Sequence, residues 1–457
     1  MSDDIAIIVL AAGKGTRMKS GLPKVMHRAA GRSLLGHALS AAQHLAPARC
    51  AVVVGPDTPE VIAEAQRFIP NAMVAEQRER HGTAHAVAMA ASALEGFKGT
   101  VLVLYGDVPL IAPESLRKLC QLISPDAPMA VLGFRAADPK GYGRLIEAEP
   151  GRLTAIIEEL DATPAQRKIG LCNSGIIAAK ADLLWRVLPK IKNQNAKSEF
   201  YLTDLIGIAA REGVTVRFAE CAEAEVMGVN DRAQLAVIEA TLQARYRASA
   251  MAGGATLIAP DTVFFSADTR LGQDVTIEPY VIFGPGVTVG DAVEILAFSH
   301  IEGATIAKGA RIGPFARLRP GADIGAEAHI GNYVEIKKSV IGPGAKINHL
   351  SYIGDASVGS KSNIGAGTIT CNYDGYDKHL TEIGANVFVG SNTALVAPIK
   401  IADGVNIAAG SVITRNVPED ALAITRPELQ IKEGWALKYR ELKAARKTAR
   451  QKPKGKS

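Results

Sequence analysis

The stretch IAKGARIGPFARLRPGADIGAEAHIGNYVEI, residues 306–336, carries an aliphatic residue at every sixth position. The same spacing extends back to Leu271 and, after slips of one residue and a gap of 19, forward to Ile413. A six-residue period is typical of a parallel β-helix, in which each unit supplies one short strand and one turn. A single coil cannot bury its inward face, so stability comes from stacking. The repeat therefore predicts a β-helical domain over residues 252–457.

The repeat is interrupted between Ile364 and Ile383. This gap contains the polar, turn-like segment TCNYDGYDK, residues 370–378. Such a composition is typical of an irregular connection. We therefore expect the gap to form a loop expelled from the coil.

The sequence before residue 230 has a different pattern, in which short aliphatic runs alternate with stretches of helical apolar spacing. This alternation predicts a Rossmann-like α/β domain over residues 1–230, with a mostly parallel sheet covered on both faces. Asp231–Ala250 lacks Gly and Pro and predicts a helical linker, assigned to residues 231–251. The expected strands are Ile5–Leu10, Ala51–Val54 and Val101–Leu104, and the expected helices are Ser33–His44, Thr83–Leu94 and Glu114–Ile123.

Composition excludes several classes of protein. The chain is 47% hydrophobic and 21% charged, which excludes a disordered protein. It has no apolar run of about 18 residues, so no membrane span is expected. The net charge of +6 is concentrated in a basic tail, Lys432 to Ser457, which argues against a nucleic-acid-binding face. Five widely spaced cysteines without a C-x-x-C pair suit a reducing cytoplasm and argue against a zinc site.

A glycine-rich segment follows the first predicted strand. It reads LAAGKGTRM, residues 10–18, and is followed by Leu22-Pro23-Lys24. Glycines after a buried strand let backbone N–H groups approach phosphate oxygens closely. Arg17 and Lys24 supply charge to neutralise a triphosphate. The spacing matches neither a Walker loop nor a dinucleotide fingerprint.

This glycine-rich segment, with its Pro-Lys, resembles the sugar-nucleotide pyrophosphorylases, which transfer nucleotides to sugar 1-phosphates. The resemblance implies a nucleotide loop, a phosphate-binding lysine, a uracil-reading segment and sugar contacts. It also implies that Asp107 and Asn230 hold Mg²⁺. The implied nucleotide and sugar-nucleotide positions are Leu10, Ala11, Ala12, Gly13, Lys24, Gln77, Gly82, Thr83, Tyr105, Gly106, Asp107, Gly143, Glu158, Asn173 and Asn230.

One position departs from that family. The family segment reads Gln-x-Glu-Gln before its Gly-Thr, whereas this chain has Gln77-Arg78-Glu79-Arg80. The effect of Arg80 on base selection is open. His81 and His85 are spaced i, i+4 without the glutamate of a zincin, so we interpret them as structural or base-contacting.

Several residues in the repeat are too large or too polar for simple turns. His349 is a candidate general base, because a histidine pKa lies near neutrality. Acyl transfer from a thioester to an amine needs such a base. Arg319 and Lys337 are candidate ligands for a sugar phosphate. Tyr352 lies nearby in the sequence.

The sequence segments around these residues resemble the acetyltransferase half of the bifunctional bacterial GlmU family. The resemblance to this family covers nearly the whole chain. It implies a left-handed β-helix that assembles as a homotrimer with sites at subunit boundaries. His349 would be the catalytic base, and Lys378 would lie near the acetyl-CoA pocket. The implied glucosamine 1-phosphate ligands are Arg319, Lys337, Tyr352 and Asn363, and the implied acetyl-CoA contacts are Ala366, Asn372, Tyr373, Ser391, Ala409 and Arg426.

The resemblance implies a two-site cytoplasmic enzyme that acetylates glucosamine 1-phosphate with acetyl-CoA. It then transfers UMP from UTP, which gives UDP-N-acetylglucosamine, a precursor of peptidoglycan and lipopolysaccharide. Two alternatives remain: a single-function nucleotidyltransferase with a regulatory β-helix, and a non-catalytic assembly subunit. The His349, Lys337 and Tyr352 constellation argues against the first, and the intact loop with Asp107 argues against the second.

Overall fold

The computed structural model describes residues 4–451, with side chains through residue 447. The chain divides into two compact units. One comprises the chain up to Val289 together with His300–Gly303, and the other comprises Gly290–Ser299 and the chain from Ala304 onward. The functional boundaries expected at residues 230 and 251 stay a prediction.

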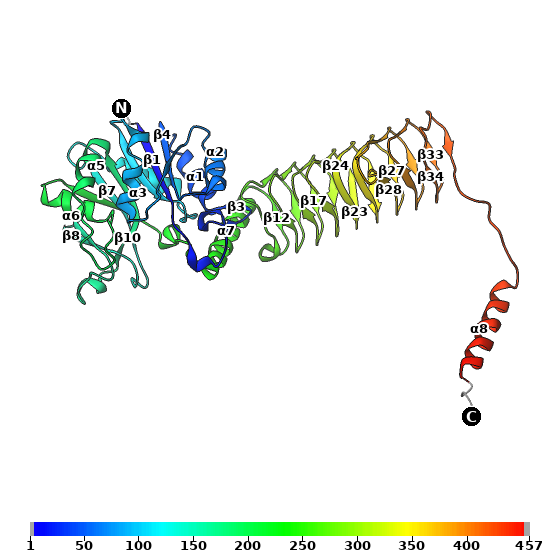
Figure 1. The fold of residues 1–457 in the computed structure, drawn as a ribbon. Helices are drawn as coiled ribbons and strands as arrows, with labels where there is room; N and C mark the ends of the chain where they lie inside the picture. The colour runs from blue at the N-terminus through cyan, green and yellow to red at the C-terminus, as the bar shows by residue number, and fades with distance from the viewer. Residues whose placement is uncertain (1–3, 452–457) are drawn as a thin grey trace, which may run out of the picture. The chain divides into compact units, whose positions relative to one another are not determined.

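The first unit contains a nine-stranded sheet, which confirms the predicted α/β class (Figure 1). Its spatial order is β5-β4-β1-β6-β10-β7-β11-β9-β8. The four strands from β5 to β6 are parallel, and β10 runs antiparallel to both of its neighbours β6 and β7. The strands are β1 (Ile5–Ala11), β4 (Arg49–Val54), β5 (Met73–Glu76), β6 (Thr100–Tyr105), β7 (Met129–Arg135), β8 (Arg144–Glu149), β9 (Arg152–Ile157), β10 (Leu171–Lys180) and β11 (Val216–Cys221).

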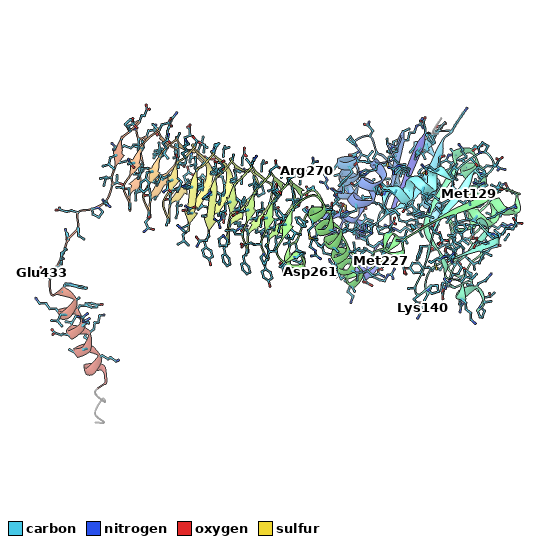
Figure 2. All side chains as sticks on the ribbon, turned by 180° about the vertical axis from the view of Figure 1, so that it is seen from behind. Met129, Lys140, Met227, Asp261, Arg270 and Glu433 are labelled. Atoms are coloured by element: carbon cyan, nitrogen blue, oxygen red, sulfur yellow. The ribbon has the colours of Figure 1, made fainter. Side chains whose placement is uncertain are left out.

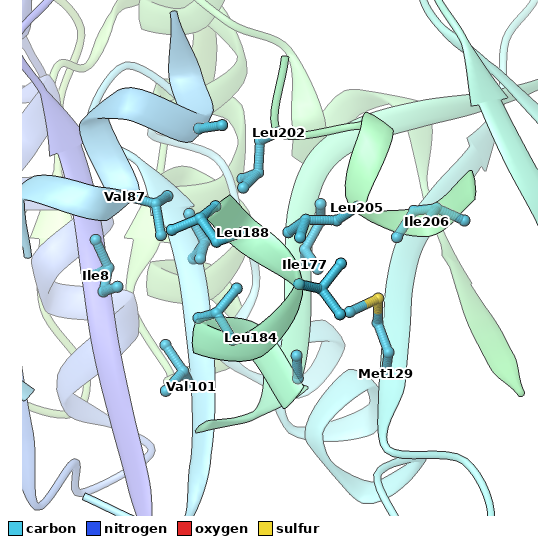
Figure 3. Close-up of a cluster of buried hydrophobic side chains, with 14 of the residues drawn as sticks. Ile8, Val87, Val101, Met129, Ile177, Leu184, Leu188, Leu202, Leu205 and Ile206 are labelled. Carbon is cyan, nitrogen blue, oxygen red and sulfur yellow. The ribbon is translucent and has the colours of Figure 1, made fainter. Parts of the chain in front are cut away.

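Both faces of this sheet are buried. Ile7 and Val9 of β1 enter one apolar cluster, whereas Ile8 and Leu10 enter the other, as the two-residue period of a strand requires. Figure 3 shows part of the second cluster, where Ile8 and Val101 lie near Leu184 and Leu188. The helices are α1 (Leu34–Gln43), α2 (Pro59–Phe68), α3 (Thr83–Met89), α4 (Pro113–Gln121), α5 (Ala181–Val187) and α6 (Asp204–Arg211). A short hairpin is formed by β2 (Arg28–Ala29) and β3 (Arg32–Ser33).

The repeat forms the predicted left-handed parallel β-helix, whose stacked coils are visible in Figure 1. In the first unit, parallel pairs join β12 to β14, β13 to β16 and β15 to β18. In the second unit, one sheet runs β17-β20-β23-β25-β27-β30-β33-β35, and another runs β19-β22-β24-β26-β28-β31-β34. A third edge pairs β21 with β24 and joins β26, β29 and β32.

The coil strands are short because each spans only one side of a coil. They are β12 (Thr256–Leu257), β13 (Arg270–Leu271), β14 (Thr276–Ile277), β15 (Ile282–Phe283), β16 (Thr288–Val289), β17 (Glu294–Ile295), β18 (His300–Ile301), β19 (Ala304–Ile306), β20 (Arg311–Ile312), β21 (Arg317–Leu318), β22 (Ala322–Ile324), β23 (His329–Asn332), β24 (Glu335–Ile341), β25 (Lys346–His349), β26 (Tyr352–Val358), β27 (Asn363–Ile364), β28 (Ile369–Cys371), β29 (Thr381–Ile383), β30 (Phe388–Val389), β31 (Ala394–Val396), β32 (Ile399–Ile401), β33 (Asn406–Ile407), β34 (Val412–Ile413) and β35 (Leu422–Ala423).

The expectation for the repeat gap is only partly right. Residues Ile369–Cys371 form the coil strand β28, which pairs with β31, so the gap is not one expelled loop. Thr370 takes the inward position that an aliphatic residue takes elsewhere, and its hydroxyl donates to the Gly354 carbonyl at 3.1 Å. An inward threonine is tolerated because this hydrogen bond satisfies its buried hydroxyl. The excursion begins at Asn372 and ends before β29.

Two corners of the coil share the left-handed backbone conformation but differ in composition. At what we call the first corner, successive coils place Phe298, Phe315, Tyr333, Leu350, Gly367, Asn392 and Gly410. At the second corner, the equivalent residues are Ala292, Gly309, Glu327, Gly344, Lys361, Asn386, Gly404 and Asp420. The conformation therefore does not itself require aromatic residues. Figure 2 shows the side chains that project from the coils.

The predicted linker is the helix α7 (Arg232–Ala252), which begins where the Asp231 side chain accepts from the Gln234 N–H. Its buried Gln243 joins the helix to the first coil. The Gln243 amide donates to the Phe265 carbonyl at 2.7 Å and accepts from the Phe265 N–H at 2.8 Å. The same amide donates to Glu239, which accepts from the Ala30 N–H of the β2–β3 hairpin.

Replacing Gln243 with leucine lowers the free energy of unfolding of this unit by about 2–4 kcal/mol, because both backbone groups of Phe265 lose their buried partner. Denaturant unfolding of the full chain measures the loss. Val237→Ala on the exposed side of α7 is the control and changes stability by less than about 0.5 kcal/mol. An unchanged midpoint for Gln243→Leu would contradict the role assigned to this amide.

The last described helix is α8 (Trp435–Gln451), whose described side chains are exposed. Within residues 4–451, no helix combines the length and the apolar character that crossing a bilayer demands.

Candidate functional site

The glycine-rich loop and Asp107 come together because β1 and β6 are parallel neighbours. Leu10 pairs with Tyr105 at the carboxyl ends of these strands, and the Gly106 N–H donates to the Leu10 carbonyl at 3.0 Å. A cavity of about 290 Å³ opens at this edge. Ten predicted residues line it: Leu10, Ala11, Ala12, Gly13, Lys24, Gln77, Gly82, Thr83, Tyr105 and Asp107.

Positive and negative side chains converge at one end of this site. The Lys24 ammonium contacts the Asp107 carboxylate and lies 3.4 Å from the Asn230 Oδ1. Arg17 also donates to the Asn230 Oδ1 at 2.9 Å. Asp107 and Asn230 therefore direct oxygen atoms at the same cation, although they are far apart in the sequence. No cluster of three or more acidic, histidine or cysteine ligands occurs among the described residues.

Gly15 makes this arrangement sterically possible. Its φ of 61° lies in the left-handed region, and the Lys24 side chain fills the position that a Cβ would need. A residue with a side chain would be strained there and would displace Lys24. The glycine-rich loop thus turns back against the lysine that follows it.

A second cavity of about 340 Å³ adjoins the first and shares Thr83, Tyr105 and Glu199 with it. The predicted Glu158 and Asn173 line it, and Gly143 lies beside them, because the Asn173 N–H donates to the Gly143 carbonyl at 2.8 Å. All predicted sugar positions are therefore brought together.

Sequence reasoning missed seven residues of this second cavity, and four of them come from one segment. Lys197, Glu199, Tyr201 and Thr203 line it from the irregular segment before α6. The Thr203 hydroxyl donates to Glu158 at 3.1 Å. The only available signal was a cluster of polar and aromatic residues in a loop, and such a signal does not indicate which cavity the loop reaches.

Burial raises the pKa of Glu158, and its hydrogen bond from Thr203 opposes that shift. Burial also raises the pKa of Tyr105, with the nearby Asp107 and Glu158 carboxylates adding to the effect. Desolvation and neighbouring acidic groups raise the pKa of Tyr201 to about 12. Both phenols therefore remain neutral donors at neutral pH.

Gln77 is held beside the first cavity by two contacts. Its amide donates to the Gly82 carbonyl at 3.2 Å and lies 3.1 Å from the His85 Nδ1. His81 stacks edge-on against His85 and precedes α3 rather than lying on it. The geometry agrees with structural roles for both histidines.

His349 ends β25 and lies in a cavity of about 340 Å³ on the β-helix, with Asn332 and Asn348 among its lining residues. The Nδ1 of His349 lies 2.7 Å from the Oδ1 of Asn332, its register partner one coil earlier. An amide oxygen accepts from Nδ1–H, and this tautomer leaves the lone pair on Nε2. Asn332 was not predicted.

Backbone hydrogen bonds stack His349 with three predicted acetyl-CoA residues. We call the residues that come directly before the first-corner residues the pre-corner column. From Tyr333 to Gly410 they are Asn332, His349, Ala366, Ser391 and Ala409. The Asn392 N–H donates to the Ala366 carbonyl at 2.7 Å, and the Gly410 N–H donates to the Ser391 carbonyl at 2.8 Å. Arg426 donates to the Ala409 carbonyl at 3.0 Å. Beyond His349, small and polar residues replace the aromatic residues of the first corner.

A charged cluster lies on the coil side that follows the first corner. Arg319 donates to Glu335 at 2.7 Å, and Glu335 pairs in register with Tyr352. Lys337 lies 3.9 Å from Asp355, which also accepts from Asn372. The adjacent Lys337 lowers the pKa of Lys378. Two neighbouring ammonium groups favour an anion between them.

The structure does not join all of the predicted acetyltransferase residues within one chain. His349 precedes the first corner, whereas Arg319, Lys337 and Tyr352 follow it. Asn363 lies opposite Lys346 at the start of its strand, and the exposed Tyr373 donates to the Gly375 carbonyl at 2.6 Å. The predicted residues thus occupy two sides of one corner.

Two protein-family models match this chain, one over the α/β part and one over the β-helix. The MobA-like NTP transferase domain family matches residues 7–169. The bacterial transferase hexapeptide family (six repeats) matches residues 268–303, 303–338 and 380–415. Together, fold and sites define a nucleotidyltransferase joined to a hexapeptide-repeat transferase.

Relatives match along nearly the whole chain. A protein of Azorhizobium caulinodans is 55% identical over 450 residues, covering 98% of this chain and 99% of its own. One of Paramagnetospirillum magneticum is 53% identical, covering 98% and 99%. One of Xanthobacter autotrophicus is 53% identical, covering 100% of both. All three are named bifunctional protein GlmU, and the chain belongs to the GlmU family.

Proposed function

We propose that this chain makes UDP-N-acetylglucosamine in two steps at separate sites. The β-helix acetylates glucosamine 1-phosphate with acetyl-CoA, and the α/β domain transfers UMP from UTP to the product and releases pyrophosphate. The observation that carries the proposal is the presence, in one GlmU-family chain, of both the Lys24–Asp107–Asn230 convergence and the pre-corner column with His349.

In uridylyl transfer, an oxygen of the sugar phosphate forms a bond to the α-phosphorus of UTP, and the bond to pyrophosphate breaks. The nucleophile is already ionised, so no general base is needed. Lys24 and Arg17 neutralise phosphate charge, and the glycine-rich loop positions the nucleotide. Glu158 and Asn173 orient the sugar.

Mg²⁺ fits this site. Asp107 and Asn230 supply hard oxygen atoms, and both already face a cation, the Lys24 ammonium. Mg²⁺ is held by one or two protein oxygens, with water and phosphate completing its coordination. When bound, it would neutralise charge that develops on the phosphates.

In acetylation, the amine nitrogen of glucosamine 1-phosphate forms a bond to the thioester carbonyl carbon, and the C–S bond breaks so that CoA leaves as a thiolate, which then takes up a proton. His349 Nε2 takes the proton from the nitrogen. Arg319, Lys337, Tyr352 and Asn363 hold the sugar phosphate. The acetyl-CoA arm follows the pre-corner column, with Ala366, Asn372, Tyr373, Ser391, Ala409 and Arg426 as contacts.

Two assays on the purified full chain test the proposal. Pyrophosphate release should require UTP, N-acetylglucosamine 1-phosphate and Mg²⁺, and CoA release should require glucosamine 1-phosphate. Pyrophosphate release without CoA release would leave a single-function nucleotidyltransferase and would contradict the two-site proposal.

We further propose a homotrimer formed through the β-helix, which works in the cytoplasm. Support for assembly comes from the first corner, where Phe315 stacks on Tyr333 at 5.1 Å and both side chains remain exposed. Exposed apolar residues gathered in one patch mark an interaction surface. The five cysteines are free, which suits a reducing compartment.

Replacing both Phe315 and Tyr333 with aspartate is expected to dissociate the trimer at micromolar concentration, because paired carboxylates would have to be buried. Sedimentation measures the mass. CoA release is expected to fall, while pyrophosphate release persists. Glu327→Ala at the second corner is the matched control and leaves the mass unchanged. A double variant that still has the mass of three chains would contradict this interface.

A further inference from the structure

Arg80, the residue that departs from the pyrophosphorylase pattern, lies in the wall of the nucleotide cavity. Its Nε donates to the Ala12 carbonyl at 2.5 Å. Ala12 and Arg80 both line the cavity, together with Gln77 and Gly82 of the base-reading segment. Among residues 4–447, Arg80 takes part in no salt bridge, so its charge is not committed to a carboxylate.

The bond to Ala12 changes the chemistry of this wall. A carbonyl oxygen that faces a nucleotide accepts from amino groups, such as the 4-amino group of cytosine. Arginine carries only donors, and these suit the 4-oxo group of uracil. Arg80 donates to the Ala12 acceptor, and Arg80 itself also lines the cavity. It also fixes the Ala12–Gly13 peptide plane and hence the direction of the Gly13 N–H.

We propose that Arg80 is a specificity-determining residue of uridylyl transfer, because it converts an acceptor wall of the nucleotide cavity into a donor wall and so favours UTP over CTP. This inference rests on the proposed function of the α/β domain. Arg80 acts on nucleotide binding and takes no part in the reaction at phosphorus.

Gly55 gives an independent means of testing this role. A Cβ at position 55 would lie 2.6 Å from the Arg80 Nη2 and 3.6 Å from the Ala12 carbonyl oxygen. The φ angle of Gly55 is not positive, so an alanine at this position would not be strained by a left-handed backbone. Gly55→Ala therefore displaces the guanidinium without removing its charge.

The experiment compares kcat/KM for UTP and CTP by pyrophosphate release in the full chain. Arg80→Ala should lower the UTP-to-CTP ratio by about tenfold or more, mainly through KM for UTP, as expected for loss of a charge-assisted hydrogen bond. Arg80→Gln should retain most of the ratio, since an amide still donates. Gly55→Ala should lower the ratio, and the double variant should resemble Arg80→Ala because the two changes act on one contact.

Arg78→Ala is the matched control, because Arg78 is exposed on the same segment and pairs with Glu76 at 3.3 Å. The UTP-to-CTP ratio of kcat/KM for Arg78→Ala should equal that of the wild type. An unchanged ratio in Arg80→Ala, or equal losses for both nucleotides, would overturn the inference and leave Arg80 a packing residue.

Failure of the proposed function is recognised separately, as a wild-type chain that consumes neither nucleotide. In that event, thermal stabilisation by UTP and by CTP decides the inference. Preferential stabilisation by UTP that is lost in Arg80→Ala supports it, and equal stabilisation in the two proteins overturns it.

Discussion

Replacing Asp107 with asparagine lowers pyrophosphate release by about 10³-fold and leaves CoA release within twofold of the wild type. The size follows from losing the carboxylate charge that Lys24 faces and that the proposed Mg²⁺ site relies on, at a site where electrostatic stabilisation is the main source of rate. Asparagine keeps the shape of the side chain, so the loss reports charge rather than packing.

Titration with Mg²⁺ measures the metal concentration needed for half-maximal activity, which would not change if Asp107 had a purely structural role. The variant should need a higher Mg²⁺ concentration for half-maximal activity, whereas KM for the sugar phosphate should change little. Asp126→Asn, on the exposed turn after α4, is the control. Loss of both activities in Asp107→Asn would show that the two sites are not independent.

Replacing His349 with alanine lowers CoA release by about 10²–10⁴-fold, the range expected for a general base. Pyrophosphate release from N-acetylglucosamine 1-phosphate is unaffected. The structural reason is the contact of the His349 Nδ1 with the Asn332 Oδ1: a proton on Nδ1 satisfies this amide oxygen, and the proposed base is then Nε2.

His300→Ala, an exposed histidine on β18, is the control for this variant. It should retain both activities. Acetylation at near wild-type rate in His349→Ala would show that another group accepts the proton. A mass of His349→Ala in solution equal to that of the wild type excludes loss of assembly as the cause of any loss of rate.

The regular parts of the fold could be predicted because their signals are local. Ile7 and Ile8 are adjacent in the sequence and enter opposite apolar clusters, which any buried parallel strand requires. The six-residue period placed the β-helix for a similar reason, since each aliphatic residue faces inward on its own coil. The prediction for the gap was wrong at Thr370, where a hydroxyl with a buried hydrogen bond replaces the aliphatic residue.

The candidate sites also contain residues that the sequence predicted and residues that it missed. Motif residues at the ends of β1 and β6 were predicted from the glycine-rich motif and the family resemblance, and the structure brings them together because these strands are parallel neighbours. Tyr201 and Thr203 were missed, because no period or motif marks a loop that reaches a cavity formed by distant strands. The departure at Arg80 was visible in the sequence, but its contact with Ala12 was not.

By itself, the sequence determined the two architectures, the glycine-rich loop and the identity of His349 as a candidate base. Only the tertiary structure decided that Asn230 and Asp107 both face Lys24, that the Nδ1 of His349 faces the Oδ1 of Asn332, and that His349 and Lys337 lie on opposite sides of the first corner. The physical reason is one of range. The periodicity of a strand or a coil can be recognised in a short segment of sequence. Contacts between distant side chains depend instead on the strand register and on the turns of all the coils and crossovers that lie between them.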